Sequence, residues 1–523
     1  MAVFLGIDIG TSSTKTLAVD ESGKILAEAN SSYPCHHLQA LWSEQDPEDW
    51  WQATITTIQA VMKQANLKPD SVKAIGLSGQ MHGAVFLDEH NKVIRPAILW
   101  NDQRTFQECE QIERLTGGRA KLIKLVANPA LTGFTAPKIL WLRNHEPKNF
   151  DKLRKVLLPK DEIRRRLTGE FATDVSDASG MLLLDVAKRT WSKELLTMLD
   201  LDAKLFARCY ESQEITGQLT QEVAQLLGLT TKCVVVGGAG DCAAGAVGNG
   251  IVKHGLLSTS IGTSGVVFVH SDKMEIDPAG RLHTFCHAVP GKWHMMGVNL
   301  SSGGSLEWFS KKLCQFEIET EAFGKDKTFE KLVSEAEVVP AGSEGLFFLP
   351  YLSGERTPHA DPDARGCFIG LSLKHGRGHM TRSILEGVDY SLRDSLEIIK
   401  EMGVPIDEIR AGGGGAQSPL WRQIEADVFA CDVVSLKAEK GSAFGAALLA
   451  TVGGGAYKSI EEACEATIQV VSKTAFNKEA AKTYQRGFSI YQDLYHSLKN
   501  DFKRIGQMTK DLQHKHPEKV AVK

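Results

Sequence analysis

The sequence predicts an α/β protein made of two related lobes, and three observations support this class. The chain has 523 residues, too many for a single hydrophobic core, so two or three domains are expected. Segments with the periodicity of strands alternate with segments with that of helices, a pattern typical of α/β lobes. A strand, a Gly-Thr-Ser turn and a second strand also occur near the start of each half, as a duplicated domain would show.

The repeated segment starts with the apolar run Val3–Ile9, turns at Gly10–Ser12 and resumes as a strand at Thr16–Val19. Its counterpart has the strand Leu256–Ile261 and the turn Gly262–Gly265, followed by a further strand. Coincidence is the alternative explanation, because Gly-Thr-Ser is a common turn.

The remaining elements follow from local periodicity and composition. Strands are expected at Val72–Leu77, Val85–Leu87, Lys232–Val236, His294–Leu300, Gly345–Leu349, Glu408–Ala411 and Asp432–Leu436. Helices are expected at Trp50–Ala65, Arg104–Thr116, Ser305–Leu313 and Thr381–Glu401. The polar, Lys-rich tail from Asp501 to Lys523 is expected to be frayed or disordered.

The composition argues against several kinds of partner. A net charge of -4 gives no broad positive field for nucleic acid or an anionic membrane, so small molecules are the expected partners. Met1–Gly10 lacks the basic region and cleavage site of a signal peptide, and Ala443–Tyr457 is too short to span a bilayer. Ten cysteines without a CxxC pair indicate reduced thiols and a cytoplasmic protein. The sequence leaves open whether the protein is a homodimer.

The first turn has the composition of a phosphate-binding turn. Asp8 lies near the end of the first strand, and the small residues Gly10, Thr11 and Ser12 follow it. Their N–H groups and hydroxyls can approach phosphate oxygens, and an aspartate at this place can hold Mg²⁺ through water. An ordinary hairpin turn is the alternative. With the matching turn at Gly262–Gly265 on the other side of a cleft, the pair would clamp a triphosphate.

Two further Gly-rich turns follow predicted strands. Gly237–Asp241 ends in a carboxylate, which is the kind of group that accepts a hydroxyl proton during phosphoryl transfer. Asp241 would also serve as a helix N-cap, and the two roles are compatible. Gly412–Ser418 lies between a strand and a helix, where its four glycines let a ribose or a flat ring approach the backbone. A flexible loop is the alternative for this last turn.

Eight motifs, in this order, resemble those of the FGGY carbohydrate kinases, which belong to the actin and sugar-kinase superfamily. They are Asp8–Lys15, Gly79–Gly83, Trp100–Asp102, Gly237–Gly248, Ser260–Gly265, Gly354–His359, Gly412–Asp427 and Gly441–Ala447. The resemblance covers about residues 1 to 490 and implies two duplicated ribonuclease H-like lobes around a central cleft. The sugar-binding lobe is expected at residues 1–248, the nucleotide-binding lobe at 249–490, and a C-terminal helix with a polar tail at 491–523.

Within that family, Gln80–Ala84 and Ser353–His359 resemble the branch that phosphorylates xylulose at its terminal hydroxyl with ATP. The resemblance implies that Asp241 is the general base and that Asp8 organises Mg²⁺. The residues expected to contact the sugar are Met81, His82, Asp241 and Cys242. The residues expected to bind the nucleotide are Gly10, Thr11, Ser12, Lys15, Gly262, Thr263, Gly413, Gly414 and Ser418.

Two positions depart from the pattern of the family. Xylulose kinases usually carry Asn or Gln after the base, whereas this chain has Cys242, a weak hydrogen-bond donor. One lost hydrogen bond is worth about 0.5–1.5 kcal/mol, enough to blur the preference among ketoses but too little to abolish binding. Ser418 stands where relatives often have Asn.

Two other features invite a functional interpretation that the local pattern does not favour. His283 and His287 have the spacing of a helical metal pair, but they lie in a segment that reads as a strand, where such a pair is about 13 Å apart. The stretch Trp42–Trp51 resembles a sugar platform, but an acidic helix start with aromatic side chains packed behind it is favoured.

Two rival functions remain open. The first is phosphorylation of another sugar or polyol of the same family, such as ribulose, gluconate or glycerol; Met81–His82 and Arg356–His359 argue against it. The second is an actin-like ATPase that uses nucleotide only to switch conformation. Such proteins share the phosphate turns but lack a sugar pocket with a base such as Asp241.

Overall fold

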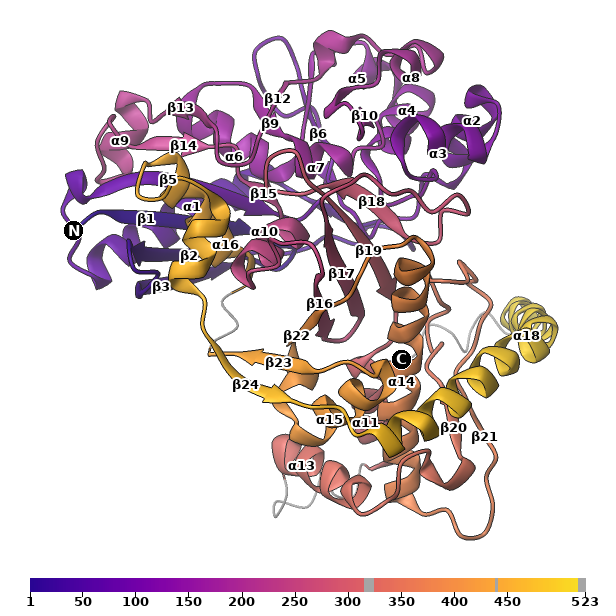
Figure 1. Ribbon diagram of the computed structural model, residues 1–523. Coiled ribbons are helices and arrows are strands. Elements are labelled where there is room, and N and C mark those ends of the chain that lie inside the picture. Colours follow the sequence, from indigo (N-terminus) through magenta and orange to yellow (C-terminus); the bar gives the residue numbers. More distant parts are fainter. Residues whose placement is uncertain (315–323, 438–440, 516–523) are drawn as a thin grey trace. The chain divides into compact units, whose positions relative to one another are not determined.

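The computed structural model describes residues 1–314, 324–437 and 441–515, which form two compact units (Figure 1). The first unit consists of Met1–His254, His270–Met295 and Lys437–Gln469, and the second of Gly255–Val269, Met296–Leu436 and the chain from Val470 onward. The sequence prediction divides the chain once, after residue 248. In the structure two later segments of the chain also belong to the first unit.

The first unit is built on a mixed sheet with the strand order β13-β14-β5-β1-β2-β3. The strands are β1 (Val3–Ile9), β2 (Ser13–Asp20), β3 (Ile25–Ser32), β5 (Val72–Gly79), β13 (Ile215–Gln218) and β14 (Val234–Val236), and β15 (Ala239–Gly240) also pairs with β5. The strands β1, β5 and β14 are parallel, whereas β1, β2 and β3 form an antiparallel meander.

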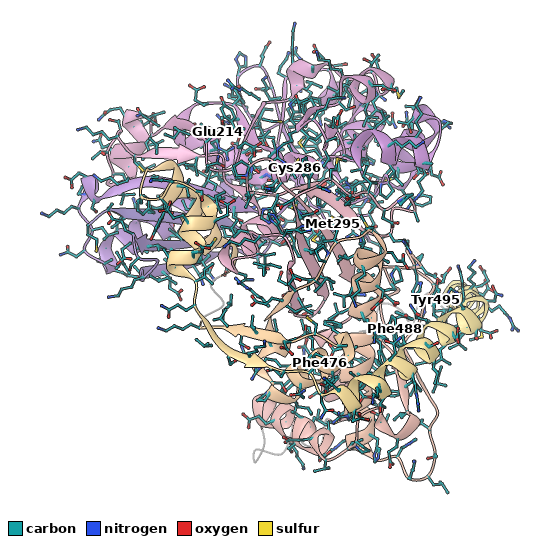
Figure 2. The ribbon with its side chains drawn as sticks, in the orientation of Figure 1. Glu214, Cys286, Met295, Phe476, Phe488 and Tyr495 are labelled. Carbon is teal, nitrogen blue, oxygen red and sulfur yellow. The ribbon has the colours of Figure 1, made fainter. Side chains whose placement is uncertain are left out.

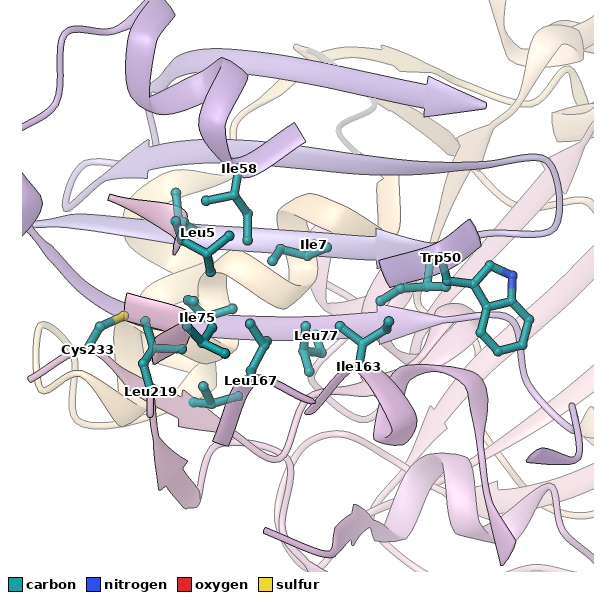
Figure 3. Packing of buried hydrophobic residues seen from close by; sticks show 14 of the residues in the cluster. Leu5, Ile7, Trp50, Ile58, Ile75, Leu77, Ile163, Leu167, Leu219 and Cys233 are labelled. Atoms are coloured by element: carbon teal, nitrogen blue, oxygen red, sulfur yellow. The ribbon is translucent and has the colours of Figure 1, made fainter. Parts of the chain in front are cut away.

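Both faces of this sheet are covered, so β1 is an almost continuous apolar run. On one face, α1 (Pro47–Gln64) and α6 (Pro159–Thr168) pack Trp50, Ile58, Ile163 and Leu167 against strand residues such as Leu5 and Leu77 (Figure 3). On the other face, α16 (Gly441–Gly453) crosses directly over Gly6 and Gly76. A Cβ at either glycine would clash with the backbone of α16.

The first unit contains further elements around this sheet. They are β4 (Glu44–Gln45), β6 (Val85–Leu87), β7 (Ala97–Ile98), α2 (Phe106–Thr116), α3 (Arg119–Val126), α4 (Thr135–His145), α5 (Pro147–Phe150), β8 (Lys155–Leu157), β9 (Ala172–Asp174), α7 (Val175–Ser179), β10 (Leu184–Asp185), β11 (Thr190–Trp191), α8 (Lys193–Met198), β12 (Arg208–Tyr210), α9 (Gln221–Leu227), α10 (Asp241–Gly248), β18 (His283–Cys286) and α17 (Ile460–Thr467).

The second unit repeats the opening of the first. β16 (Leu256–Ile261) is antiparallel to β17 (Gly265–Ser271) and parallel to β22 (Glu408–Gly412), just as β1 is antiparallel to β2 and parallel to β5. In each turn the glycine donates back across the turn: Gly10 N to Ser13 O at 3.0 Å, and Gly262 N to Ser264 O at 3.0 Å in a turn that is one residue shorter. The predicted α/β class with duplicated lobes is therefore confirmed.

The rest of the second unit consists of helices and short strands. They are β19 (Trp293–Asn299), α11 (Gly303–Leu313), α13 (Gly324–Glu337), β20 (Phe347–Leu349), β21 (Cys367–Ile369), α14 (Arg377–Glu401), α15 (Pro419–Phe429), β23 (Val433–Leu436), β24 (Val470–Thr474) and α18 (Lys478–Lys515). The ring of Tyr390 on α14 lies 5.4 Å from that of Tyr491 and 6.1 Å from that of Phe488 on α18. Figure 2 labels Phe488 and Tyr495 on this last helix.

The predicted strands and helices all occur, with shifted ends. The strand expected at Gly345–Leu349 begins only at Phe347, because Ser343–Gly345 forms a short 3-10 helix. The prediction of a frayed tail from Asp501 is wrong up to Lys515, because α18 continues to that residue. The last part of the predicted tail, residues 516–523, lies outside the described residues. No described helix combines the length and the apolar character that crossing a bilayer requires.

Candidate active site

The register of three parallel strands brings Asp8 and Asp241 to the same edge of the first unit. Asp8 on β1 pairs with Ser78 on β5, and Ser78 pairs in turn with Ala239 on β15. Asp241 follows two residues later as the first residue of α10. The carboxyl ends of parallel strands are the usual location of ligand sites in α/β sheets. The N-cap of α10 is Gly240, so the predicted capping role of Asp241 is wrong.

The environment of Asp241 suits a proton acceptor that works near neutral pH. Burial, followed by the charge of Asp8, raises the pKa of Asp241 to about 7, against the lowering effect of Cys242. The Cys242 N–H donates to Asp241 Oδ1 at 2.7 Å. Burial also raises the pKa of Asp8, with Ser78 and Lys15 opposing it. A carboxyl with a pKa near the working pH is the kind of group that serves as a general base.

The predicted phosphate turn Gly10–Ser12 is held by side chains that take up its carbonyl oxygens. Gly10 O accepts from Tyr33 OH at 2.6 Å, and Thr11 O accepts from Gln45 Nε2 at 2.6 Å. Trp100 Nε1 donates to Thr11 Oγ1 at 2.9 Å. Carbonyl oxygens repel phosphate. Because Tyr33 and Gln45 donate hydrogen bonds to the carbonyl oxygens of this turn, the turn can bind an anion more favourably.

Lys15 lies on β2 directly opposite Asp8 in the antiparallel register. Its ammonium also lies 3.4 Å from Glu28 Oε2, and its side chain is partly exposed. A long, partly exposed side chain in this place suits contact with an anionic ligand.

The predicted sugar residues Met81 and His82 lie beside the turn that carries Asp241. A Cβ at Gly240 would lie 2.8 Å from Met81 Cγ, and one at Gly180 would lie 2.9 Å from Met81 Cε. Met81 therefore packs directly on the glycine that precedes Asp241. His82 Nδ1 donates to Gly180 O at 2.7 Å, and the His82 ring meets the ring of Phe134 edge-on at 4.9 Å.

His82 adopts a left-handed backbone with φ 69°, which is costly for a residue other than glycine. Its carbonyl oxygen accepts from Thr135 Oγ1 at 3.0 Å and from Lys138 Nζ at 2.9 Å. Lys138 is fully buried and also donates to Gly133 O at 2.6 Å. Burial lowers the pKa of Lys138 to about 7, with Asp102 opposing it.

Thr135, Lys138 and Ser442 are not among the site residues predicted from the sequence. A lone lysine in the apolar helix α4 was a signal for a buried, functional cation. Ser442 lies in the predicted motif Gly441–Ala447, and its Oγ donates to Asp241 O at 3.0 Å. That contact joins α16 to the residue proposed as base.

Cys242 is partly exposed, and both its N–H and its thiol interact with the carboxylate of Asp241. Cys242 therefore contacts the carboxylate of Asp241 and is not fully buried. All ten cysteines are present as thiols rather than disulfides.

In the second unit two Gly-rich turns follow neighbouring parallel strands. Ser260 on β16 pairs with Gly412 on β22, so the turns Gly262–Gly265 and Gly413–Gln417 lie at adjacent strand ends. Gly413 has φ 77°, and a Cβ there would lie 2.6 Å from Ile261 O, so only glycine fits. The turn Gly414–Gln417 forms a short 3-10 helix.

A cavity of about 530 Å³ adjoins the turn Gly414–Gln417, within the size range of small-molecule sites. Its lining residues come from the turn and from α13, namely Phe329, Glu330, Val333, Ser334, Glu337, Gly414, Gln417, Ser418 and Pro419. Ser418 is the N-cap of α15, where its Oγ accepts from Trp421 N at 3.3 Å. The predicted residues Gly414 and Ser418 thus line a cavity large enough for a nucleoside.

The local structure of two further features agrees with the interpretation that the sequence favours. His283 begins the strand β18, as predicted, and the rings of His287 and His294 meet at 5.8 Å inside the first unit. The described residues contain no group of three or more His, Cys, Asp or Glu side chains arranged to hold a metal ion. In the stretch Trp42–Trp51, Asp46 caps α1, and Trp50 is buried with its Nε1 donating to Gln45 Oε1 at 3.0 Å.

Two family models match the chain: the N-terminal domain of the FGGY family of carbohydrate kinases at residues 3–248, and its C-terminal domain at residues 257–454. The chain therefore belongs to the FGGY family of carbohydrate kinases.

Relatives within that family agree over almost the full length. The chain is 39% identical to the xylulose kinase of Bacillus subtilis over 500 residues, which covers 96% of this chain and 98% of the relative. It is 43% identical to the xylulose kinase of Escherichia coli over 462 residues, which covers 88% of this chain and 92% of the relative. A crystal structure of a xylulose kinase from Rhodospirillum rubrum superposes with a TM-score of 0.89 at 30% identity, and the match covers 96% of this chain and 100% of that one. The gluconokinase of Bacillus subtilis is 31% identical over 510 residues, covering 97% and 98%.

Proposed function

We propose that this protein is a xylulose kinase, which transfers the γ-phosphoryl group of ATP to the terminal hydroxyl of D-xylulose and so forms D-xylulose 5-phosphate. The higher identity to xylulose kinases than to the gluconokinase supports this substrate. The structural observation that carries the proposal is the placement of Asp241, whose pKa is raised to about 7, beside the Met81 side chain.

In the proposed reaction, Asp241 accepts the proton of the terminal hydroxyl as that oxygen attacks the γ-phosphorus and ADP leaves. Met81 and His82 border the sugar, and Cys242 lies where it reaches a sugar hydroxyl. Because His82 Nδ1 donates to Gly180 O, the Nε2 atom of the neutral ring is an acceptor, and the contact with Gly180 orients the ring.

The residues present fit a magnesium ion held through water. Asp8 Oδ1 is a buried carboxylate oxygen for which the described residues provide no hydrogen-bond partner. Mg²⁺ prefers one or two carboxylates together with water and phosphate oxygens, so Asp8 alone suffices on the protein side. When bound, the ion would neutralise charge on the phosphates of ATP. The chain's own part is to keep the Asp8 carboxylate on the edge that also carries Gly10–Ser12.

For the nucleotide, we propose that Gly10, Thr11, Ser12 and Lys15 in the first unit bind phosphate groups. In the second unit we assign phosphate contact to Gly262 and Thr263. Gly413, Gly414 and Ser418 would contact the nucleoside, and the cavity beside α13 has the size for it. We place the enzyme in the cytoplasm, in keeping with its ten thiols.

A substrate panel tests the proposal. ADP release would be measured with D-xylulose, ribulose, gluconate, glycerol and no sugar, at equal concentrations. The proposal expects the highest kcat/KM with xylulose and negligible turnover without sugar. A preference for gluconate would identify the rival kinase, and turnover independent of sugar would identify an ATPase.

A further inference from the structure

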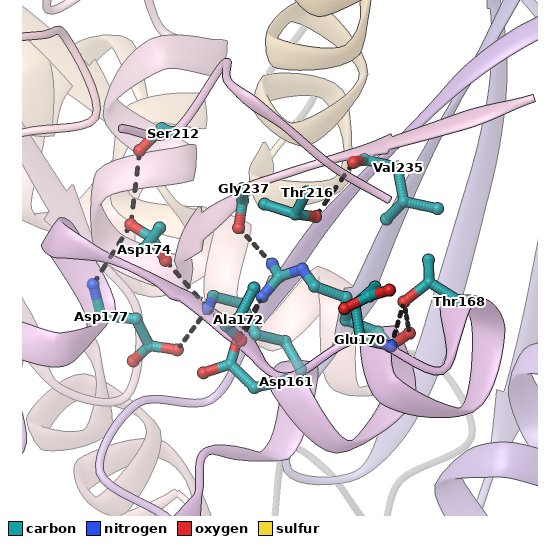
Figure 4. A network of polar contacts seen from close by, with 12 residues as sticks. Asp161, Thr168, Glu170, Ala172, Asp174, Asp177, Ser212, Thr216, Val235 and Gly237 are labelled. Atoms are coloured by element: carbon teal, nitrogen blue, oxygen red, sulfur yellow. Dashed lines mark hydrogen bonds and ion pairs between the residues drawn. The ribbon is translucent and has the colours of Figure 1, made fainter. Parts of the chain in front are cut away.

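A buried ionic cluster lies in the first unit on α6, β9 and α7 (Figure 4). Lys160 Nζ lies 2.7 Å from Asp161 Oδ1, 2.8 Å from Asp174 Oδ1 and 3.3 Å from Asp177 Oδ2. Arg164 Nη1 lies 2.5 Å from Asp161 Oδ1. All five side chains are at most 1% exposed, so water does not screen these charges.

The charges in the cluster balance when one carboxyl group is neutral. Burial raises the pKa of Asp177 well above its ordinary range, Lys160 lowers it, and Asp161 and Asp174 raise it further. With Asp177 protonated, two cations face two carboxylates.

The cluster reaches the start of the turn that carries Asp241. Arg164 Nη2 donates to Gly237 O, while Arg164 Nη1 donates to Ala172 O at 2.9 Å. Gly238 N donates to Ser212 O at 2.8 Å, and Ser212 Oγ donates to a carboxylate of the cluster at 3.3 Å. At the start of the turn, Gly237 O is therefore bound directly by the cluster, and Gly238 N is linked to it through Ser212.

The end of the same turn is tied to the cluster through Ser176. Gly240 N donates to Ser176 Oγ at 3.2 Å, and Ser176 Oγ donates to Asp174 Oδ2 at 2.5 Å. Asp174 in turn faces Lys160 across 2.8 Å. A continuous chain of polar contacts thus leads from a buried lysine to the backbone N–H of Gly240, the residue that immediately precedes Asp241.

Stability alone is a weak reason for such a cluster, because apolar residues of similar volume often stabilise a buried site as well or better. Fixed geometry is a stronger reason, since a general base loses efficiency when it is displaced by a fraction of an ångström. Pairing with β5 holds Ala239 and Gly240, but Gly237 and Gly238 precede that pairing, and Gly238 has a left-handed backbone with φ 67°.

We propose that this cluster positions the base of the reaction: Arg164 and Ser176 hold the two ends of the Gly237–Gly240 turn and thereby fix the Asp241 carboxylate for proton transfer. The inference rests on the role of Asp241 proposed above. Arg164 and Ser176 are positioning residues, because they act through the backbone of the turn.

The sharpest test is Ser176→Ala, which removes the acceptor of the Gly240 N–H and leaves every charge of the cluster in place. The matched control is Ser383→Ala. Ser383 is a buried helical serine of the second unit, and its Oγ donates to Met380 O at 2.9 Å within its own helix. For each variant, kcat, KM for xylulose, KM for ATP and the melting temperature are measured.

A positioning role predicts that Ser176→Ala lowers kcat by about 10- to 100-fold while KM for ATP changes less than about twofold. Ser383→Ala should keep the wild-type kcat and lose less melting temperature than Ser176→Ala, because the Ser176 hydroxyl both donates to Asp174 and accepts from Gly240. A kcat of Ser176→Ala within twofold of wild type would overturn the proposal, whatever its melting temperature.

A second pair covers the case in which Ser176→Ala does not fold. Arg164→Lys keeps the cation but shortens the reach to Gly237 O, and it should lower kcat in the same way. Arg165→Lys is its control, because Arg165 pairs with Glu162 at 2.8 Å instead of with the turn.

The variant Asp241→Asn distinguishes the positioning role of Arg164 and Ser176 from the assignment of Asp241 as the base. A large loss in Asp241→Asn without any loss in Ser176→Ala and Arg164→Lys overturns the positioning role alone. Undiminished turnover in Asp241→Asn overturns the assignment of the base, and the positioning role with it.

Discussion

Replacing Thr135 by valine should weaken sugar binding without affecting ATP. The Thr135 hydroxyl and the Lys138 ammonium both donate to His82 O. Together they hold His82 at φ 69°, a conformation that costs of order 1–3 kcal/mol. Valine has nearly the same shape as threonine but lacks the hydroxyl, so the change removes one hydrogen bond and little volume.

The size of the effect follows from the net value of that hydrogen bond. A hydrogen bond of about 0.5–1.5 kcal/mol corresponds to a change of about 2- to 13-fold in an equilibrium constant. The loss should appear in KM for xylulose, because His82 borders the proposed sugar site. Lys138→Met should have a larger effect, since it also removes the donor to Gly133 O.

The assay is the coupled measurement of ADP release, with xylulose varied at saturating ATP and ATP varied at saturating xylulose. Thr135→Ser, which keeps the hydroxyl, is the control and should retain the wild-type KM for xylulose. An unchanged KM for xylulose in Thr135→Val would refute the reasoning. An equal rise of both KM values would indicate a general structural defect.

Three further predictions concern the proposed base Asp241, the residue Cys242 that follows it, and the buried histidine His294. Asp241→Asn should keep the fold and ATP binding but lower kcat by about 10²–10⁴, and near-wild-type turnover would exclude Asp241 as the base. Cys242→Asn should lower KM for xylulose by at most about tenfold if residue 242 faces the sugar; an unchanged KM with a clear loss of melting temperature would show that it does not. Burial lowers the pKa of His294 to about 3, so its neutral form stabilises the fold fully above the unfolded pKa of about 6.5, and this contribution is lost as the pH falls toward 3. His294→Phe should therefore lose about 2 kcal/mol less free energy of unfolding between pH 7 and pH 5 than the wild type, as measured by urea unfolding; equal losses in the two proteins would contradict the prediction.

Local sequence determined the elements and the chemical character of the turns. A run such as Val3–Ile9 is apolar at every position because both faces of its strand are covered, and that property is visible in the sequence. The Gly-Thr-Ser turns and the glycines of Gly412–Gly415 were likewise visible, because their backbone conformations require small residues. The duplication and the family resemblance followed from the order of these local signals.

The tertiary structure decided the features that depend on contacts between residues distant in the sequence. Asp8 and Asp241 meet because the parallel register of β1, β5 and β15 aligns distant segments, and no local pattern encodes that register. The pKa of Asp241 depends on burial and on the charge of Asp8, both of which exist only after folding. Lysine is ordinarily exposed on helices, yet Lys138 and Lys160 are both fully buried, with partners that come from other segments of the chain. Amphipathic periodicity shows which residues face a core, but the partner of a buried charge is set by chain segments remote in sequence.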